Sequence, residues 1–175
     1  MADKRARARH RHESASSPGP AARDDAARIA ALVPLGSACA FANARMLGRI
    51  VGTFYDEMLR PADLRAAQLA LMWAIAAREP VDQKALGRVT QTDQTTLSRT
   101  VENLRAAGLV NVDAGSDRRM RLIRLSPRGR RAFARALPYW REAQEALAGT
   151  VSIEDLARLA RAARRFARDR SPSGA

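Results

Sequence analysis

Hydrophobic residues recur at helical spacing along most of the chain. Between Ser37 and about Leu59 they fall every three or four positions, which predicts an amphipathic helix. Ser37 is placed to cap its start, and Pro61 ends it. A second helix is predicted over about residues 65–78. Its run at residues 69–75 is apolar on nearly every side, which predicts burial on most faces. The apolar positions of the first helix are Cys39, Ala42, Met46, Ile50, Phe54 and Met58.

Acidic capping residues mark the starts of two more helices. Asp82 predicts the N-cap of a short helix that runs through about Val89. Asp93 predicts the N-cap of a second helix that ends at Ala107, because Gly108 is typical of the position that follows a helix. The buried stripe of this second helix is expected to consist of Leu97, Val101 and Leu104.

The hydrophobic pattern changes from helical to β-like between residues 109 and 125. Residues 109–113 and 121–125 are rich in the residue types that strands favour, and residues 114–120 supply a turn between them. This pattern predicts a two-stranded hairpin whose tip carries a cluster of arginines.

Two helices are predicted after the hairpin. Ser126 and Pro127 form a typical helix start, and the helix continues to about Leu147 with Pro138 inside it. Ser152 is placed to cap the last helix. Its apolar stripe is expected to consist of Leu156, Leu159, Ala163 and Phe166.

The positive charge of the chain is concentrated near the hairpin. The 175 residues include 31 Lys and Arg against 18 Asp and Glu, a formal net charge of +13. Nearly half of this excess lies in residues 114–131, where seven arginines face Asp117 alone. A general preference for Arg and Ala explains part of the composition, since the chain has 37 alanines. The local cluster nevertheless predicts a polyanionic partner.

Composition excludes several classes of protein. No apolar run approaches the roughly 20 residues of a membrane-spanning helix, and the N-terminus has no apolar signal region, so we expect no membrane and a cytoplasmic location. Cys39 is the single cysteine, and His10 and His12 both lie in a polar tail. With no Gly-rich phosphate loop and no suitably spaced pair of carboxylates, we expect no metal site, no cofactor and no enzymatic activity.

The order of short helix, turn, helix and basic hairpin predicts a winged helix-turn-helix. An α-helix fits the major groove of B-DNA, and the hairpin is narrow enough to reach the neighbouring minor groove. Residues 93–100 present amide, hydroxyl and guanidinium groups outward. Thr95, Thr96 and Ser98 are poor choices for a plain solvent-facing helix, which favours DNA recognition over a simple surface role.

Four segments of the chain resemble the MarR family of bacterial transcriptional regulators. They are residues 64–68, 93–99, 104–110 and 117–129, and the similarity extends more weakly over about residues 35–168. The most specific part is Asp117-Arg118-Arg119 followed by a strand and the pattern Leu-Ser-x-x-Gly. Gln91 and Gln94 depart from the family, which often has Gly and Arg at these positions.

The resemblance implies a homodimer on a pseudo-palindromic operator in double-stranded DNA. The expected role is a repressor that a small aromatic or phenolic effector releases. By the family pattern, Arg119 enters the minor groove and Asp117 stabilises the wing through a salt bridge. The predicted DNA contacts are Gln91, Asp93, Gln94, Thr95, Thr96, Ser98, Arg99, Arg118, Arg119 and Arg121.

The predicted fold class is mainly α with a small β-hairpin wing, a winged helix-turn-helix with N- and C-terminal dimerisation helices. The chain divides into a disordered basic tail (1–24), N-terminal dimerisation helices (25–60), the DNA-binding domain (61–126), C-terminal dimerisation helices (127–170) and a frayed tail (171–175).

Two kinds of effector site follow from the resemblance. One is a ligand crevice, for which core packing is the alternative role of each lining residue. The other is a redox site at Cys39, in the first turn of a helix where the dipole stabilises a thiolate. Counting back from Tyr55 places the family's reactive position on Phe41, which favours a buried or interface thiol instead. A non-specific basic nucleic-acid-binding protein is a further alternative. The candidate crevice residues are Met46, Phe54, Met72, Trp73 and Trp140.

Overall fold

The computed structural model describes residues 20–115 and 120–170, which belong to two compact units divided between Leu47 and Gly48. The first unit contains α1 (Pro20–Leu32), the 3-10 helix η1 (Val33–Ala38) and the start of α2 (Ala40–Met58). Most of the described residues of this unit are exposed, including large apolar side chains.

Two predictions for the first unit are wrong. The predicted disordered tail extends too far, to residue 24, because α1 already begins at Pro20. Proline suits the first position of a helix, and an Ala-rich segment follows it. Ser37 does not cap α2. Its hydroxyl donates a hydrogen bond to the Pro34 carbonyl (3.1 Å) within η1, and α2 begins at Ala40.

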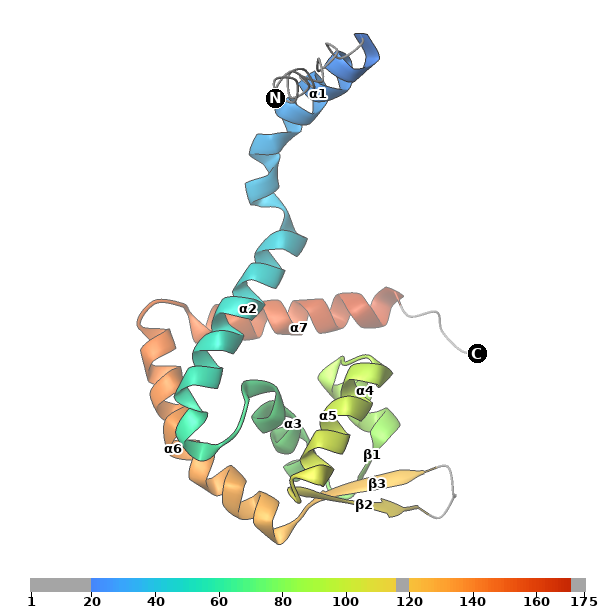
Figure 1. The fold of residues 1–175 in the computed structure, drawn as a ribbon, viewed down its shortest axis with the longest axis vertical. Coiled ribbons are helices and arrows are strands. Elements are labelled where there is room, and N and C mark those ends of the chain that lie inside the picture. The colour runs from blue at the N-terminus through green and yellow to red at the C-terminus, as the bar shows by residue number, and fades with distance from the viewer. Residues whose placement is uncertain (1–19, 116–119, 171–175) are drawn as a thin grey trace, which may run out of the picture. The chain divides into compact units, whose positions relative to one another are not determined.

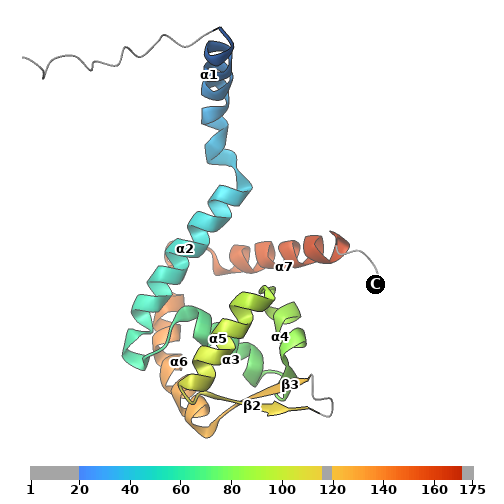
Figure 2. The same ribbon diagram turned by 45° about the vertical axis from the view of Figure 1, so that its right-hand side comes forward.

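The second unit contains a small sheet, the helices packed on it and two long helices. In both views α3, α4 and α5 lie on one side of the sheet (Figures 1 and 2). After the last part of α2, its elements are η2 (Arg60–Ala62), α3 (Ala66–Ala76), β1 (Val81–Asp82), α4 (Gln83–Thr90), α5 (Gln94–Ala106), β2 (Val110–Ala114), β3 (Arg121–Leu125), α6 (Pro127–Ala148) and α7 (Ile153–Arg170).

The sheet has three antiparallel strands rather than two. The predicted hairpin is confirmed by the pairing of β2 with β3, in register from Val110 opposite Leu125 to Ala114 opposite Arg121. Strand β1 adds to the other edge of β3, with Val81 opposite Ile123, so the strand order is β1-β3-β2. A two-residue strand is too short to show an alternating pattern, which is why the sequence did not predict it.

The predicted helix caps in this unit are confirmed. The Asp82 carboxylate accepts from the Ala85 amide (2.9 Å), and the Ser126 hydroxyl accepts from the Gly129 amide (2.9 Å). Gly108 follows α5 with a left-handed φ of 68°. Short capping side chains supply partners for amides that have none inside the helix.

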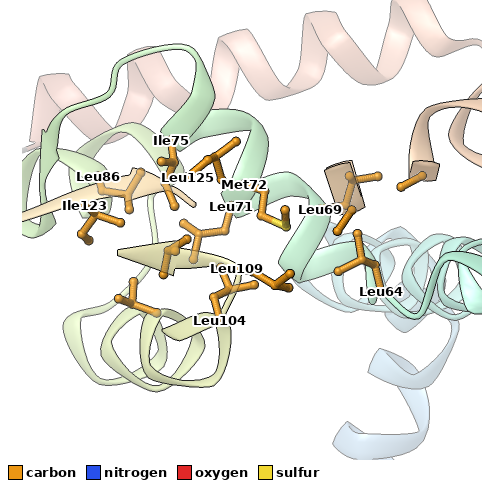
Figure 3. Packing of buried hydrophobic residues seen from close by; sticks show 14 of the residues in the cluster. Leu64, Leu69, Leu71, Met72, Ile75, Leu86, Leu104, Leu109, Ile123 and Leu125 are labelled. Carbon is orange, nitrogen blue, oxygen red and sulfur yellow. The ribbon is translucent and has the colours of Figure 1, made fainter. Parts of the chain in front are cut away.

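A hydrophobic core joins α3, α4, α5 and the sheet (Figure 3). The predicted stripe of α5 is confirmed, because Leu97, Val101 and Leu104 are all buried. The largest side chains with almost no exposed surface are Leu59, Met72, Ile75, Leu86, Leu97, Leu104 and Ile123.

Carboxylates fix the helices that flank this core. Glu79, whose side chain is 14% exposed, accepts from the Leu125 amide (2.7 Å) and forms an ion pair with Arg130. Asp56 on α2 accepts from the Ala66 amide (2.7 Å) at the start of α3. The bonds of Arg130 and Asp56 tie the start of α6 and the end of α2 to the DNA-binding domain predicted at residues 61–126, and the Glu79–Leu125 bond fixes the end of β3 within it.

Replacing Gln91 with glycine is expected to raise the free energy of unfolding by about 1 kcal/mol. Gln91 ends α4 with a left-handed φ of 52°, which costs a side-chain-bearing residue free energy that glycine does not lose. Chemical denaturation measures the change. The matched control is Ala106→Gly in ordinary helical backbone, which should lose about 1 kcal/mol. A loss in both variants would contradict the backbone argument.

Candidate nucleic-acid interface

A groove lies between the start of α4, the exposed face of α5 and the turn end of the hairpin, at Met120 and Arg121. Its volume is about 590 Å³. Polar and charged residues predominate in its walls, as a nucleic-acid surface requires. The groove residues are Asp82, Gln83, Lys84, Gln94, Ser98, Met120 and Arg121.

Ser98 is the centre of a hydrogen-bond network in this groove. Its hydroxyl oxygen accepts from the Gln83 side-chain amide at 2.7 Å and from the Gln94 side-chain amide at 3.5 Å. Each glutamine keeps a carbonyl oxygen and a second amide hydrogen for another partner. The network therefore orients two amide groups, one from each helix, toward the same groove.

Gln83 and Lys84 were missed by sequence reasoning. They occupy the first turn of α4, directly after the Asp82 cap, and only the folded chain brings them beside α5. The available signal was the polar character of that first turn, which the sequence shows but which many surface helices share.

The start of α5 is held by Asp93. Its carboxylate accepts from the Thr96 amide at 2.9 Å, and hydrogen bonds from Thr96 hold the pKa of Asp93 below its ordinary value. Asp93, grouped with the predicted DNA contacts, therefore positions the start of α5. Because an ionised carboxylate repels phosphate, its own contact with DNA stays a prediction. The exposed side chains that it holds in place are those of Gln94, Thr95 and Thr96.

The other predicted contact residues lie on two elements. Arg99 is exposed on α5, and Arg121 is exposed at the start of β3. Gln91, at the end of α4, donates its side-chain amide to the Arg88 carbonyl (2.7 Å). The predicted wing residues Asp117, Arg118 and Arg119 lie outside the described residues.

Some cations of this region are already neutralised by ion pairs, and others remain available to bind phosphate. Arg105 forms a bidentate pair with Glu102 (2.9 and 2.6 Å), and Arg124 pairs with Asp113 at 3.1 Å. The hydrogen bond to Arg105 lowers the pKa of Glu102, and the charge of Arg121 contributes to this shift. Within residues 20–115 and 120–170, the cations of α4, α5 and β3 that form no ion pair are Lys84, Arg88, Arg99 and Arg121, and of these Lys84 and Arg121 line the groove.

An apolar cavity of about 300 Å³ lies between α2, α3 and α6. Of the five predicted crevice residues, Trp140 lines it, beside Leu69 and Tyr55. The Tyr55 hydroxyl donates a hydrogen bond to the side-chain Oε1 of Gln144, and burial raises the pKa of this phenol. Tyr55 therefore presents a neutral polar group beside an apolar wall.

The remaining predicted crevice residues have other surroundings. Met72 has no exposed surface and belongs to the core, the alternative role considered for it. The Trp73 ring packs on Trp140 (centroids 5.1 Å apart), and the Phe54 ring packs edge-on against Tyr55 (5.8 Å). Met46, on the first unit, is exposed.

Cys39 is an exposed free thiol at the break between η1 and α2. The expectation of a buried thiol is therefore wrong for the single chain, whereas an interface thiol and a redox role stay predictions.

Among residues 20–115 and 120–170, no group of three or more His, Cys, Asp or Glu residues is arranged to hold a metal ion. No single helix of this part of the chain has the length and apolar character needed to cross a membrane, and one pair of consecutive helices meets those criteria only together.

Comparisons with known proteins agree on one family. A model of the MarR family matches residues 62–120. The transcriptional regulator HosA of Escherichia coli is 30% identical over 94 residues, which cover 53% of this chain and 70% of HosA. The M. tuberculosis transcriptional regulator MosR, solved in complex with DNA, is 33% identical with a TM-score of 0.65, covering 73% of this chain and 98% of that chain. The Streptomyces coelicolor regulator PcaV, solved with its natural ligand, has the same fold at 22% identity and a TM-score of 0.64, covering 75% of this chain and 93% of PcaV.

Proposed function

This chain belongs to the MarR family of transcriptional regulators, and from this membership we propose that it represses transcription as a homodimer bound to a pseudo-palindromic operator. The family consists of DNA-binding regulators with a winged helix fold, not enzymes. The observation that carries the proposal is the groove beside α5, where Gln83 and Gln94 converge on Ser98 and where Lys84 and Arg121 form no ion pair with the described residues.

In the proposed complex, some residues of this surface contact base edges and others contact only phosphates. The exposed face of α5 enters the major groove, where Gln94, Thr95 and Arg99 meet base edges and phosphates. A glutamine amide pairs best with adenine, so Gln94 favours adenine at its position. Lys84 and Arg121 on either side contact phosphates and fix the register without reading sequence.

Exposed apolar side chains support the homodimer. Leu159 and Phe166 on α7 are each 64% exposed, and Phe41 on α2 is 71% exposed. Apolar groups left in water on several helices favour burial against a second copy, as the family pattern implies. Because the relative placement of two DNA-binding units sets the spacing of half-sites, the dimer also determines the operator.

The apolar cavity beside Trp140 is the proposed effector site. Its walls from Leu69, Ala70 and Val51 suit an aromatic body, and the Tyr55 hydroxyl supplies a polar contact. A ligand there touches α2, α3 and α6 together. It therefore changes how the DNA-binding domain is held on the long helices, which is a route to release of the operator.

Selection from a pool of random duplexes, followed by anisotropy titrations at several salt concentrations, tests the proposal. A specific regulator should enrich a palindrome and bind it at least about 10³-fold more tightly than a scrambled duplex. Equal affinity for both duplexes would instead support the non-specific basic binder.

Replacing Arg119 with alanine is expected to weaken operator binding by about 1–3 kcal/mol with little change in melting temperature. The family pattern assigns this residue to the minor groove. If Arg119 also neutralises a phosphate, the slope of log affinity against log salt should fall by roughly one per subunit. Arg131→Ala on α6, outside the groove, serves as the control and should bind normally. Normal binding by the Arg119 variant as well would contradict the assignment.

A further inference from the structure

A second polar cavity, separate from the groove, lies at the opposite end of α5. Its volume is about 480 Å³, and it is formed by the end of α2, η2, the starts of α3 and α6, and the residues that follow α5. Ala107 lines this cavity, whereas Gln94 lines the groove. These two positions are roughly 20 Å apart along the helix at 1.5 Å per residue, so the cavity and the groove are separate sites.

Arginines from three parts of the fold surround this cavity. They are Arg60 on η2, Arg65 before α3, and Arg128 and Arg135 on α6. Against these four guanidinium groups stand two carboxylates, Asp56 and Asp63, so two positive charges are uncompensated.

Ion pairs within the protein do not neutralise this excess positive charge. Arg65 reaches Asp56 at 3.4 Å, while the same carboxylate also accepts from the Ala66 amide at 2.7 Å. Within the part of the chain that the structure describes, Arg60, Arg128 and Arg135 have no ion-pair partner. Three forked donors therefore remain available around one cavity.

The floor of the cavity is apolar and closed. Ala62, Leu64, Leu109 and Ala132 line it, and each is at most 7% exposed because each also belongs to the core. This floor has a lower dielectric constant than water. The charges of the arginines above it are therefore screened less than they would be in solvent. The floor is also fixed in position by the core, so a ligand does not have to order it.

We propose that this cavity binds a small organic dianion, a phosphate monoester or a dicarboxylate. Guanidinium groups match the paired oxygens of phosphate and carboxylate, and two charges on the ligand balance the two uncompensated charges of the cavity. The volume lies in the range of roughly 300–1,000 Å³ that metabolite-sized ligands occupy. The apolar floor accepts the carbon skeleton between the charged groups.

Occupancy of this cavity links α2, α3 and α6 through one ligand. Its effect on operator affinity would rest on the proposed function, since it requires a DNA-binding dimer. Binding itself does not depend on DNA, so the two ideas are tested separately.

Isothermal titration of the full-length protein at constant ionic strength tests the site, with glycerol 3-phosphate and succinate as dianions and acetate as the monoanion. At least one dianion should bind more tightly than acetate. Whichever dianion binds identifies the ligand as a phosphate or a dicarboxylate, and failure of both would overturn the proposal.

Single substitutions locate the site. Arg128→Gln and Arg135→Gln should each weaken dianion binding about tenfold, the effect of losing a charge-assisted hydrogen bond. Arg131→Gln, an exposed arginine of the same helix that does not line the cavity, should change affinity less than twofold. Asp63→Asn removes a facing negative charge and should tighten binding severalfold.

Equal affinities in the Arg128, Arg131 and Arg135 variants would show that the dianion binds elsewhere, which would overturn the proposal. Melting curves check that each variant is folded. If Arg128→Gln does not fold, Arg135→Gln alone provides the test. Operator titrations on the same variants should give normal affinity without dianion, so loss of dianion binding and loss of DNA binding are distinguishable.

Discussion

Replacing Gly129 with alanine is expected to lower the free energy of unfolding by about 3 kcal/mol or more. A Cβ at this position would lie 1.9 Å from the Leu109 carbonyl oxygen and 2.9 Å from its carbonyl carbon. Both atoms belong to the backbone, so no side-chain rotation relieves the overlap. Either α6 or the segment that joins α5 to β2 has to move.

Neither segment is free to move. The Ser126 amide donates to the same Leu109 carbonyl at 3.0 Å, and the Ser126 hydroxyl donates to the Gly108 carbonyl at 2.6 Å. Ser126 also caps α6 by accepting from the Gly129 amide. A shift large enough for a methyl group breaks these bonds or leaves them strained, and it disturbs the buried Leu109 side chain.

Chemical denaturation at equal protein concentrations measures the loss, because stability of an oligomer depends on concentration. Gly149→Ala is the matched control. A Cβ there meets nothing closer than the Ala146 carbonyl oxygen at 3.5 Å, so it should change stability by less than about 1 kcal/mol. Equal losses in the two variants would contradict the role of the close approach at Gly129.

The same contact explains why part of the fold was predictable. The pattern Leu-Ser-x-x-Gly at residues 125–129 was part of the most specific sequence feature, and its serine and glycine each have a local role. Ser126 caps a helix, and Gly129 allows that helix to approach the backbone at Leu109. Caps, turns and helix stripes depend on neighbours in sequence, so Asp82, Asp93 and the α5 stripe were predicted correctly.

The parts that were not predicted depend on partners distant in sequence. Strand β1 exists because Val81 pairs with Ile123, 42 positions later, and its two residues show no pattern of their own. Gln83 was not predicted because its place in the groove depends on a hydrogen bond to Ser98 on another helix. Periodicity identified Met72 as apolar and inward, but only the packing of α3 separates a core position from a crevice position.

Ser37 shows a different limit. A serine before an apolar run is a typical N-cap, but Pro34 and Gly36 nearby form a 3-10 helix that uses the serine first. Gln91 shows the opposite case. The position was recognised as one where the family often has glycine, and the left-handed backbone supplies the physical reason.

Introducing glutamate at both Leu159 and Phe166 is expected to separate the proposed dimer and to weaken operator binding by at least about a hundredfold. Both side chains are exposed on α7 in the single chain, where Phe166 has the Arg170 guanidinium 5.4 Å from its ring centre. The change therefore adds no buried charge to the isolated chain. In a dimer that covers these side chains, two glutamates per subunit become uncompensated charges in an apolar interface.

The loss of DNA affinity follows from the loss of linkage between two DNA-binding units. A dimer that holds one half-site presents its second unit to the other half-site at high effective concentration, and separate chains lose this advantage. Affinity for a duplex that contains a single half-site should change little. Analytical ultracentrifugation measures the oligomeric state, and anisotropy on full-site and half-site duplexes measures the two affinities.

The matched control places glutamates on the opposite side of the same helix with the same spacing, at Arg161 and Arg168. Both are exposed and lie away from the stripe that contains Leu159. This control changes more charge than the test variant but should leave the oligomeric state intact. A dimer that survives the Leu159 and Phe166 substitutions would show that α7 is not its interface. Equal loss of full-site and half-site binding would show that the variant damages the DNA-binding unit rather than the link between two units.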